Sequence, residues 1–459
     1  MENLQSNAIN PGAVSNNKVV VGIDVGTTKI AVFIGEKNTQ GEIKIIGMGK
    51  TESVGVEHGE VKIITKASES IRKAVEIAEG KCNIKVTEAY VGIAGHNIKS
   101  TPQRGKKIIK EDHHIIDQED IDTLLEDQRS VAMPPGESII DIVPQDYIID
   151  GETGIIDPVG REGKTIEVNY NLISGDETNV HNIYRSVSMA GYNVKGLILE
   201  PIASAEAVVD DDEKTAGICL VDIGGGTTDM AIFKEGILRH TAVIQLAGNS
   251  ITNDIKDSFR IMQNQAEALK THYGDCLRTE KSKNTVIQVP GLKGRENREV
   301  TLYMLSEVVN ARVQMILQQV DYELKNDSYD QMLIAGIVLT GGGSKLQHIA
   351  QYTEFITGIT TRIGEPDGIW LNENANDYAD PMYSTGIGLV LKGFENEDKI
   401  SGNVVEEKEV ATIQQEEPII PENKKKKEKS KGKTSDSSAK RFMNAVSNFF
   451  AKILNDSVE

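Results

Sequence analysis

Two similar sequences, far apart in the chain, restrict the folds available to it. Each predicts a short buried strand ending near an aspartate, a tight turn rich in glycine and threonine, and a second apolar strand. The first is VVVGIDVGTTKIAVFIG, which contains Asp24, and the second is GICLVDIGGGTTDMAIF, which contains Asp222. The turn residues are Gly26, Thr27 and Thr28 in the first and Gly224, Gly225, Gly226, Thr227 and Thr228 in the second.

These residue types suit the binding of a polyphosphate. Glycine lets backbone N–H groups approach and surround an anion, which a Cβ would obstruct. Threonine hydroxyls add donors, and an aspartate oxygen is a suitable ligand for a hydrated magnesium ion. One such hairpin is more often only a turn, but two matched copies predict two lobes that close on the same ligand.

A third element has the sequence IVLTGGGS, in which Gly341, Gly342 and Gly343 follow an apolar strand. Lys345 and Leu346 come next and are expected to open a helix, whose start attracts anions weakly. By itself this is also what a simple strand-to-helix joint looks like. Together, however, the three elements resemble the actin/sugar-kinase/DnaK-type ATPase superfamily, with two phosphate loops and an adenosine loop.

That resemblance implies an α/β fold with two lobes that bind ATP and Mg²⁺ between them. Asp24 and Asp222 would organise the metal and its water, and Lys29 would contact a phosphate. Segments 199–206 and 383–389 look like the two helices that connect the lobes. By resemblance to the DnaK-type proteins, Glu200 in the first would position the attacking water. Stabilisation of a helix start by an acidic residue is the alternative for Glu200.

Residues Ala266 to Lys270 resemble the helix that flanks the ribose and adenine. Glu267 and Lys270 are three positions apart on that predicted helix, so both side chains can reach one ligand. A solvent-exposed ion pair is the alternative interpretation.

Composition excludes several classes of protein. The chain has 459 residues and a formal net charge of −19, which disfavours general nucleic-acid binding. The sequence has no apolar run long enough to span a membrane. Residues 1–17 are polar and read as a flexible leader without the pattern of a signal peptide. Three scattered cysteines indicate a reducing, cytoplasmic environment.

The C-terminal segment reverses its charge along its length. Residues 395–422 contain nine acidic and two basic residues, whereas residues 423–454 contain ten basic and two acidic residues. Residues 395–439 have the composition of a disordered linker. Residues 440–455 then predict an amphipathic helix, because their apolar residues form one stripe. The residues predicted to contact the membrane are Lys440, Arg441, Phe442, Met443, Val446, Phe449, Phe450, Ile453 and Leu454.

Such a helix is expected to lie in the interface of a membrane, with its basic residues near anionic lipid headgroups. Docking on a partner protein is the alternative. A single tail would bind weakly, whereas many tails on one polymer would bind firmly through their effective concentration.

An actin-type core with a C-terminal amphipathic tail closely resembles the bacterial cell-division family FtsA. The resemblance implies a protein that polymerises on the cytoplasmic face of the inner membrane, anchors FtsZ filaments there and helps to recruit later division proteins. Asn310 and Arg312 are the candidates for contact with the FtsZ C-terminal peptide. ATP hydrolysis, if present, is expected to be slow, so a scaffold role ranks above an enzymatic one.

The resemblance also implies a domain organisation. The expected parts are a first lobe at 18–92, with 172–202 and 384–394, an inserted subdomain at 93–171 and a second lobe at 203–383, whose outer subdomain is 235–325. Two other functions remain open from the sequence. A phosphotransferase of the sugar-kinase branch would consume ATP rapidly with a hydroxylated substrate, and a pilus-assembly actin homologue would use the same core as an adaptor.

Overall fold

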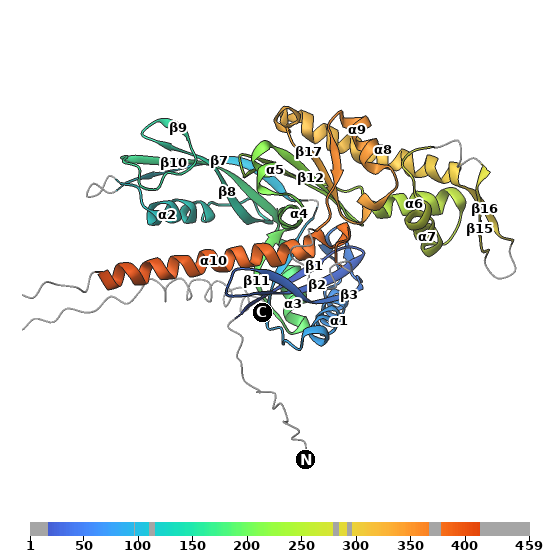
Figure 1. Cartoon of the computed structure of the whole chain (residues 1–459), viewed down its shortest axis with the longest axis horizontal. Helices are drawn as coiled ribbons and strands as arrows, with labels where there is room; N and C mark the ends of the chain where they lie inside the picture. The colour runs from blue at the N-terminus through green and yellow to red at the C-terminus, as the bar shows by residue number, and fades with distance from the viewer. Residues whose placement is uncertain are drawn as a thin grey trace, which may run out of the picture. The chain divides into compact units, whose positions relative to one another are not determined.

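The computed structural model describes residues 17–413, apart from 96, 110–114, 279–283, 292–295 and 367–377. This part of the chain contains two five-stranded sheets with equivalent topology (Figure 1). In each, three antiparallel strands continue into two parallel strands. In spatial order, the first sheet is β11 (Asn193–Leu199), β6 (Glu88–Ile93), β1 (Lys18–Val25), β2 (Lys29–Lys37) and β3 (Ile43–Glu52). The second is β14 (Ile237–Ile244), β13 (Thr228–Lys234), β12 (Ile218–Ile223), β17 (Gly336–Thr340) and β18 (Thr361–Ile363).

The two hairpins expected from the sequence are therefore β1–β2 and β12–β13, at equivalent places in the two sheets. Six consecutive residues of β1 and all six of β12 are buried, as expected for strands covered on both faces. Asp24 pairs with Ala31 across the first hairpin, and Asp222 pairs with Asp229 across the second. Each aspartate consequently lies next to its glycine–threonine turn.

Helices cover both sheets. In the first lobe they are α1 (Ile64–Cys82) and α3 (Glu177–Ala190), and a small hairpin of β4 (Val56–Glu57) and β5 (Glu60–Val61) precedes α1. In the second lobe they are α5 (Asp211–Ala216), α6 (Gly248–Phe259), α7 (Gln263–Tyr273), α8 (Leu302–Asn326) and α9 (Ile349–Thr357). Side-chain caps fix three of these starts, because Asp176 accepts from the backbone of α3, Asp210 from that of α5 and Thr301 from that of α8.

Two helices connect the lobes, as the sequence predicts: α4 (Glu200–Val208) and α10 (Ser384–Ile413). Both contribute to one hydrophobic core that also contains residues from both large sheets. They cross closely at Gly388, where a Cβ would lie 1.7 Å from the carbonyl oxygen of Ala203. A residue without a side chain is therefore required at this crossing.

The inserted subdomain has its own sheet and core. The strand order is β7 (Lys99–Ile108), β10 (Thr165–Asp176), β8 (Glu137–Ile149) and β9 (Glu152–Ile155), and α2 (Gln118–Arg129) packs on it. Strand β10 continues beyond the expected boundary at 171 and leads directly into α3. Hydrogen bonds also join the insert to β14 of the second lobe, from Gln145 to the Leu238 carbonyl and from Asn171 to the Arg239 carbonyl.

Two more expected boundaries differ from the structure. The outer part of the second lobe does not begin at 235, because β14 belongs to the large sheet; it comprises α6, α7, α8 and the hairpin of β15 (Val286–Val289) and β16 (Arg298–Thr301). The third glycine run does not open an α-helix directly. It forms a 3-10 turn, η3 (Gly342–Lys345), and α9 starts only at Ile349; further 3-10 turns are η2 (Tyr329–Met332) and η6 (Pro381–Tyr383).

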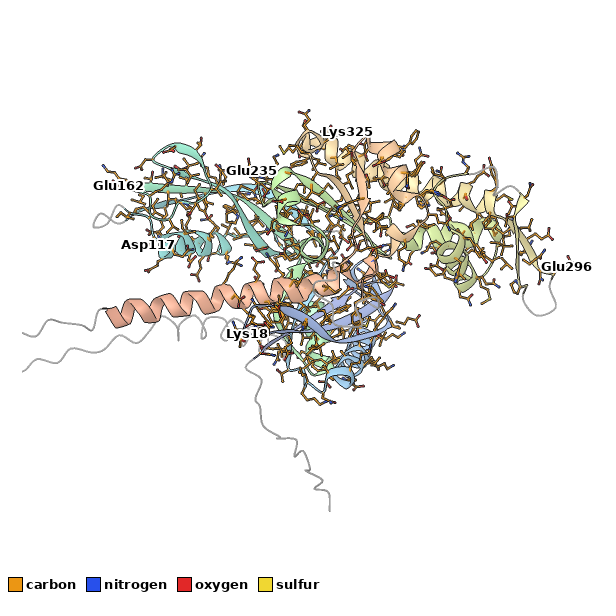
Figure 2. The ribbon with its side chains drawn as sticks, viewed as in Figure 1. Lys18, Asp117, Glu162, Glu235, Glu296 and Lys325 are labelled. Atoms are coloured by element: carbon orange, nitrogen blue, oxygen red, sulfur yellow. The ribbon has the colours of Figure 1, made fainter. Side chains whose placement is uncertain are left out.

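The predicted linker also begins later than residue 395, because α10 continues to Ile413. Ion pairs hold this part of the helix on the first sheet. Lys18, which is labelled in Figure 2, contacts Asp398 with an N–O distance of 3.0 Å. Asp398 also contacts Lys37, and Glu397 contacts Lys195. Burial disfavours the charged form of Lys195. The hydrogen bonds that Lys195 donates to Glu397 and Glu88 outweigh this effect and raise the pKa of Lys195 to about 12.

Several sequence predictions lie outside the described residues, namely most of the leader at 1–17, the linker from 414 onward and the amphipathic segment 440–455. Among the helices that are described, none combines the length and the apolar character that crossing a membrane requires. Cys219 and Cys276 are buried, and Cys82 is partly buried.

We predict that Gly388→Ala destabilises the protein by about 1–3 kcal/mol, because the added methyl group overpacks the crossing of α4 and α10. Gly80→Ala in α1 is the matched control, since a Cβ there meets no atom within 4 Å. This control should be neutral or stabilising by up to about 1 kcal/mol through helix propensity. Urea unfolding of both variants measures the difference. Equal stability of the two would contradict the close crossing.

Candidate functional site

A cavity of about 780 Å³ lies between the two lobes, within the range usual for ligand pockets. Both glycine–threonine turns and the third glycine run form its walls. Of the residues predicted as ligand-binding, catalytic or metal-binding, the cavity is lined by Asp24, Gly26, Thr27, Thr28, Lys29, Glu200, Asp222, Gly224, Gly225, Gly226, Thr227, Glu267, Lys270, Gly341, Gly342 and Gly343.

The two turns approach each other directly across the cavity. A Cβ at Gly225 would lie 1.9 Å from the hydroxyl oxygen of Thr28, so the side chain of one lobe fills the space that glycine leaves in the other. The β4–β5 hairpin reinforces this contact. Gly59 N–H donates to Thr27 Oγ1 at 3.0 Å, and His58 Nδ1 lies 3.2 Å from the Gly226 carbonyl oxygen. The lobes are therefore joined at the loops expected to hold phosphate.

Two aspartates lie at equivalent positions on the cavity floor but have different partners. Asp24 Oδ2 is 2.5 Å from Lys29 Nζ. Burial opposes the charge of Lys29, but the attraction of Asp24 and then of Asp222 and Glu200 raises its pKa. Asp222 Oδ2 accepts hydrogen bonds from the Ser204 and Thr385 hydroxyls, at 2.6 and 3.2 Å. Burial raises the pKa of Asp222, and these bonds oppose that rise.

Two further carboxyl groups add negative charge to the same cavity. Burial, together with Asp24, Asp229 and Asp222, raises the pKa of Glu200 well above its ordinary value. Burial and the neighbouring Asp222 raise the pKa of Asp229 to about 7. Asp229 Oδ2 accepts from the Thr227 hydroxyl at 2.8 Å, but its buried Oδ1 has no hydrogen-bond partner. Four carboxyl groups therefore line the same cavity as Lys29, and their mutual repulsion favours the entry of a cation.

No group of three or more His, Cys, Asp or Glu side chains suitable for holding a metal is present among the described residues. Magnesium, however, commonly binds through one or two carboxylates, with waters and substrate phosphates as the other ligands. Asp24 and Asp222, with the unpartnered oxygen of Asp229 beside them, are chemically suited to that kind of site.

The second-lobe wall has a polar network beside Gly248, at the start of α6. Lys270 Nζ lies 2.8 Å from Glu267 Oε2 and donates to the Gly248 carbonyl oxygen at 3.1 Å. The Thr252 hydroxyl donates to the same Glu267 carboxylate at 2.5 Å. Glu267 and Lys270 therefore form an ion pair, but it differs from the solvent-exposed pair expected as an alternative, because the Lys270 side chain is only 12% exposed and both residues line the cavity.

Not every predicted residue reaches the cavity. Thr228 is fully buried in β13, where its hydroxyl donates to the Leu246 carbonyl at 2.7 Å, and it does not line the cavity. Its place in a strand, where successive side chains face opposite sides, explains the difference from Thr227. Asn310 and Arg312 lie on α8, where Asn310 donates to the Cys276 carbonyl and Arg312 forms a bidentate pair with Asp254.

The structure also brings residues to the site that sequence reasoning did not select. Ser204 and Thr385 come from the two connecting helices, His58 from the β4–β5 hairpin and Asp229 from the end of the second hairpin. Asp229 was recognisable from its pairing position opposite Asp222. Ser204 and Thr385 carry no comparable signal, because buried hydroxyls in helices usually bond to the backbone of their own helix.

The equivalent lobes and the loop-lined cavity between them define an actin-like protein. Solved structures agree. The "PilM-PilN type IV pilus biogenesis complex" matches with a TM-score of 0.61 and 15% identity over 82% of this chain and 98% of that one. MreB5 of Spiroplasma citri bound to ADP matches with a TM-score of 0.50 and 14% identity over 85% and 98%. At these identities the likeness concerns the fold alone.

Sequence comparison defines the family. The model of "Cell division protein FtsA" matches residues 219–388, and that of the "SHS2 domain inserted in FTSA" matches residues 95–174. Cell division protein FtsA of Pseudomonas aeruginosa is 36% identical over 386 residues, which are 84% of this chain and 91% of that protein. The chain therefore belongs to the FtsA family and has an actin-like role in cell division.

We predict that Gly225→Ala separates the two turns, because its methyl group would occupy the position of the Thr28 hydroxyl. The variant should melt at a lower temperature than the wild type. Thr28→Ala removes that hydroxyl, so adding it to Gly225→Ala should recover part of the loss, as coupling between contacting residues requires. Thermal unfolding of both single variants and the double variant tests this contact. Strictly additive effects would show that the two turns do not touch.

Proposed function

We propose that this FtsA-family chain binds ATP with Mg²⁺ between its lobes and uses the nucleotide to control self-association. The single observation that carries this proposal is the shared cavity, whose walls come from both glycine–threonine turns. Backbone N–H groups of Gly224 to Gly226 and the hydroxyls of Thr27 and Thr227 would receive the phosphates. Glu267, Lys270 and the glycines at 341–343 would contact the nucleoside. The ADP bound to the MreB5 fold neighbour supports the assignment.

Asp24 and Asp222 would hold the magnesium ion, which neutralises phosphate charge when it is bound. Lys29, which is paired with Asp24, would contact a phosphate when the metal also binds Asp24. Burial and the neighbouring carboxyl groups raise the pKa of Glu200, and a cation bound beside them would lower it and favour the ionised form that positions the attacking water. This dependence agrees with slow hydrolysis and favours a switch over an efficient enzyme.

Lobe closure provides the link from nucleotide to assembly. A ligand that contacts both turns binds more tightly to the closed arrangement of the lobes than to an open one. This difference in affinity shifts the equilibrium toward the closed arrangement. The insert would move with this closure, because Gln145 and Asn171 bond to β14 of the second lobe. We therefore propose that the insert carries contacts along a filament and to later division proteins.

The sequence beyond the described residues supports a membrane role. We propose that residues 440–455 bind anionic lipid on the cytoplasmic face of the inner membrane and that α8, through Asn310 and Arg312, receives the FtsZ C-terminal peptide. Arg312 is already paired with Asp254, so an acidic peptide would have to compete for a guanidinium that has its partner. Membership of the FtsA family disfavours both the sugar kinase and the pilus adaptor.

We predict that Asp222→Ala weakens MgATP binding by about 10-fold to 100-fold, the effect of losing a strong interaction of a charged group. Asp257→Ala is the matched control, because that side chain is 76% exposed on α6. Titration of the full chain with a fluorescent ATP analogue measures both affinities. Wild-type affinity in Asp222→Ala would remove this residue from the site.

We predict that the full chain pellets with vesicles of anionic phospholipid and that Phe450→Asp abolishes pelleting, since a charge on the apolar stripe cannot enter the interface. Asn448→Asp adds the same charge on the opposite face of the predicted helix, so it should retain most binding. FtsZ should pellet only with variants that bind vesicles. If both substitutions act equally, or a chain ending at residue 439 pellets like the full one, the membrane proposal fails.

A further inference from the structure

Two hydroxyl groups hold one oxygen of the Asp222 carboxylate. Ser204 Oγ donates to Asp222 Oδ2 at 2.6 Å, and Thr385 Oγ1 lies 3.2 Å from the same oxygen. The two hydroxyl oxygens are 3.0 Å apart. The proton of Thr385 therefore reaches Asp222 directly or supports Ser204, which donates to Asp222 in turn. Both arrangements favour the ionised carboxylate.

These hydroxyls come from the two helices that connect the lobes. Ser204 lies in α4, one residue after Ala203, whose carbonyl oxygen is the closest neighbour of Gly388 in α10. Thr385 is in the same α10, one turn before Gly388. The close crossing thus fixes the separation of the two hydroxyls. If the helices slide or separate, the two donors can no longer reach one oxygen.

The other oxygen of Asp222 faces a different element. A Cβ at Gly341 would lie 2.2 Å from Asp222 Oδ1, so this oxygen is next to the third glycine run. Asp222 and Thr385 both line the cavity, whereas Ser204 is buried behind them. The two hydroxyl groups therefore bind the carboxylate through Oδ2, and Oδ1 lies beside the third glycine run.

We propose that Ser204 and Thr385 are positioning residues of the nucleotide site, which hold the Asp222 carboxylate oriented toward the metal and phosphates of the ligand. Because both donors belong to the connecting helices, the orientation of Asp222 also depends on the arrangement of the hinge. The inference rests on the proposed binding of MgATP and names the residues that link this site to the hinge between the lobes.

A merely structural role would have different consequences. Two buried hydroxyls that only satisfy a buried carboxylate would affect stability, and nucleotide binding would not depend on them beyond that effect. A positioning role instead predicts a specific change in the Mg²⁺ requirement, because Asp222 acts on the nucleotide through the metal.

The test measures binding of a fluorescent ATP analogue to the full chain at increasing Mg²⁺ concentration, and again in excess chelator. Thr385→Val keeps the shape of the side chain but removes the hydroxyl. It should raise the Mg²⁺ concentration for half-maximal binding about 10-fold, the effect of one hydrogen bond to a charged group. Binding in chelator should stay within about 2-fold of the wild type, well below that hydrogen-bond effect. Thr385→Ser restores a hydroxyl and should restore the wild-type Mg²⁺ requirement.

Two further variants keep the test decisive. Thr353→Val is the matched control, because Thr353 is a fully buried helical threonine whose hydroxyl donates to the Ile349 carbonyl in α9. It should lower stability without changing the Mg²⁺ requirement. Ser204→Ala removes the shorter hydrogen bond to Asp222 and should raise the Mg²⁺ requirement at least as strongly as Thr385→Val. This variant still tests the inference if Thr385→Val does not fold.

The outcomes separate this inference from the proposed function. A wild-type chain that does not bind the nucleotide at any Mg²⁺ concentration overturns both. Normal wild-type binding, with an unchanged Mg²⁺ requirement in Thr385→Val and Ser204→Ala, overturns only the positioning role. The same holds if Thr385→Ser is as impaired as Thr385→Val, since packing would then explain the loss.

Discussion

The direct contact between the two glycine–threonine turns is the constraint on which the rest of this structure depends. Thr28 of one lobe fills the space left by the absent side chain of Gly225 in the other. This contact brings two separate strand ends, with Asp24 and Asp222, to one cavity. It also sets the position of the β4–β5 hairpin, whose His58 and Gly59 bond to the same turns. Without it, each lobe would carry only half of a site.

The charge distribution in the cavity is compatible with the proposed joint binding of a cation and phosphates. Glu200 and Asp229 have raised pKa values because they are buried near other carboxyl groups, and Lys29 opposes this rise at Glu200. A polyphosphate by itself would add repulsion, whereas a divalent cation with its phosphates would reduce it. A cation bound near Glu200 would also lower the raised pKa of that carboxyl group.

Helix α10 joins the parts of the molecule that a switch must connect. Its first turn contributes Thr385 to the cavity, its Gly388 crosses α4, and its later residues Glu397 and Asp398 are paired with lysines of the first sheet. A change in lobe closure therefore acts on a helix that is held at its first turn, at its crossing with α4 and at its ion pairs with the first sheet. The insert is coupled to the second lobe in a similar manner through β14.

The sequence alone was sufficient for the two hairpins, the third glycine run and the connecting helices, because buried strands and glycine turns are local patterns. It also indicated the fold class and the family, since the order of these elements along the chain is specific. Boundaries were less predictable. Strand β10 continues past 171 and α10 past 395 because pairing with β8 and ion pairs with the first sheet extend them.

Only the tertiary structure decided which side chains share the cavity. Thr227 lines it and Thr228 does not, because the alternation of β13 turns the second hydroxyl toward Leu246. Ser204 and Thr385 meet at Asp222 although they are far apart in sequence, because two helices cross where Gly388 leaves room. Local patterns specify the elements, but these contacts depend on how distant elements pack, and no short segment of the sequence contains that information.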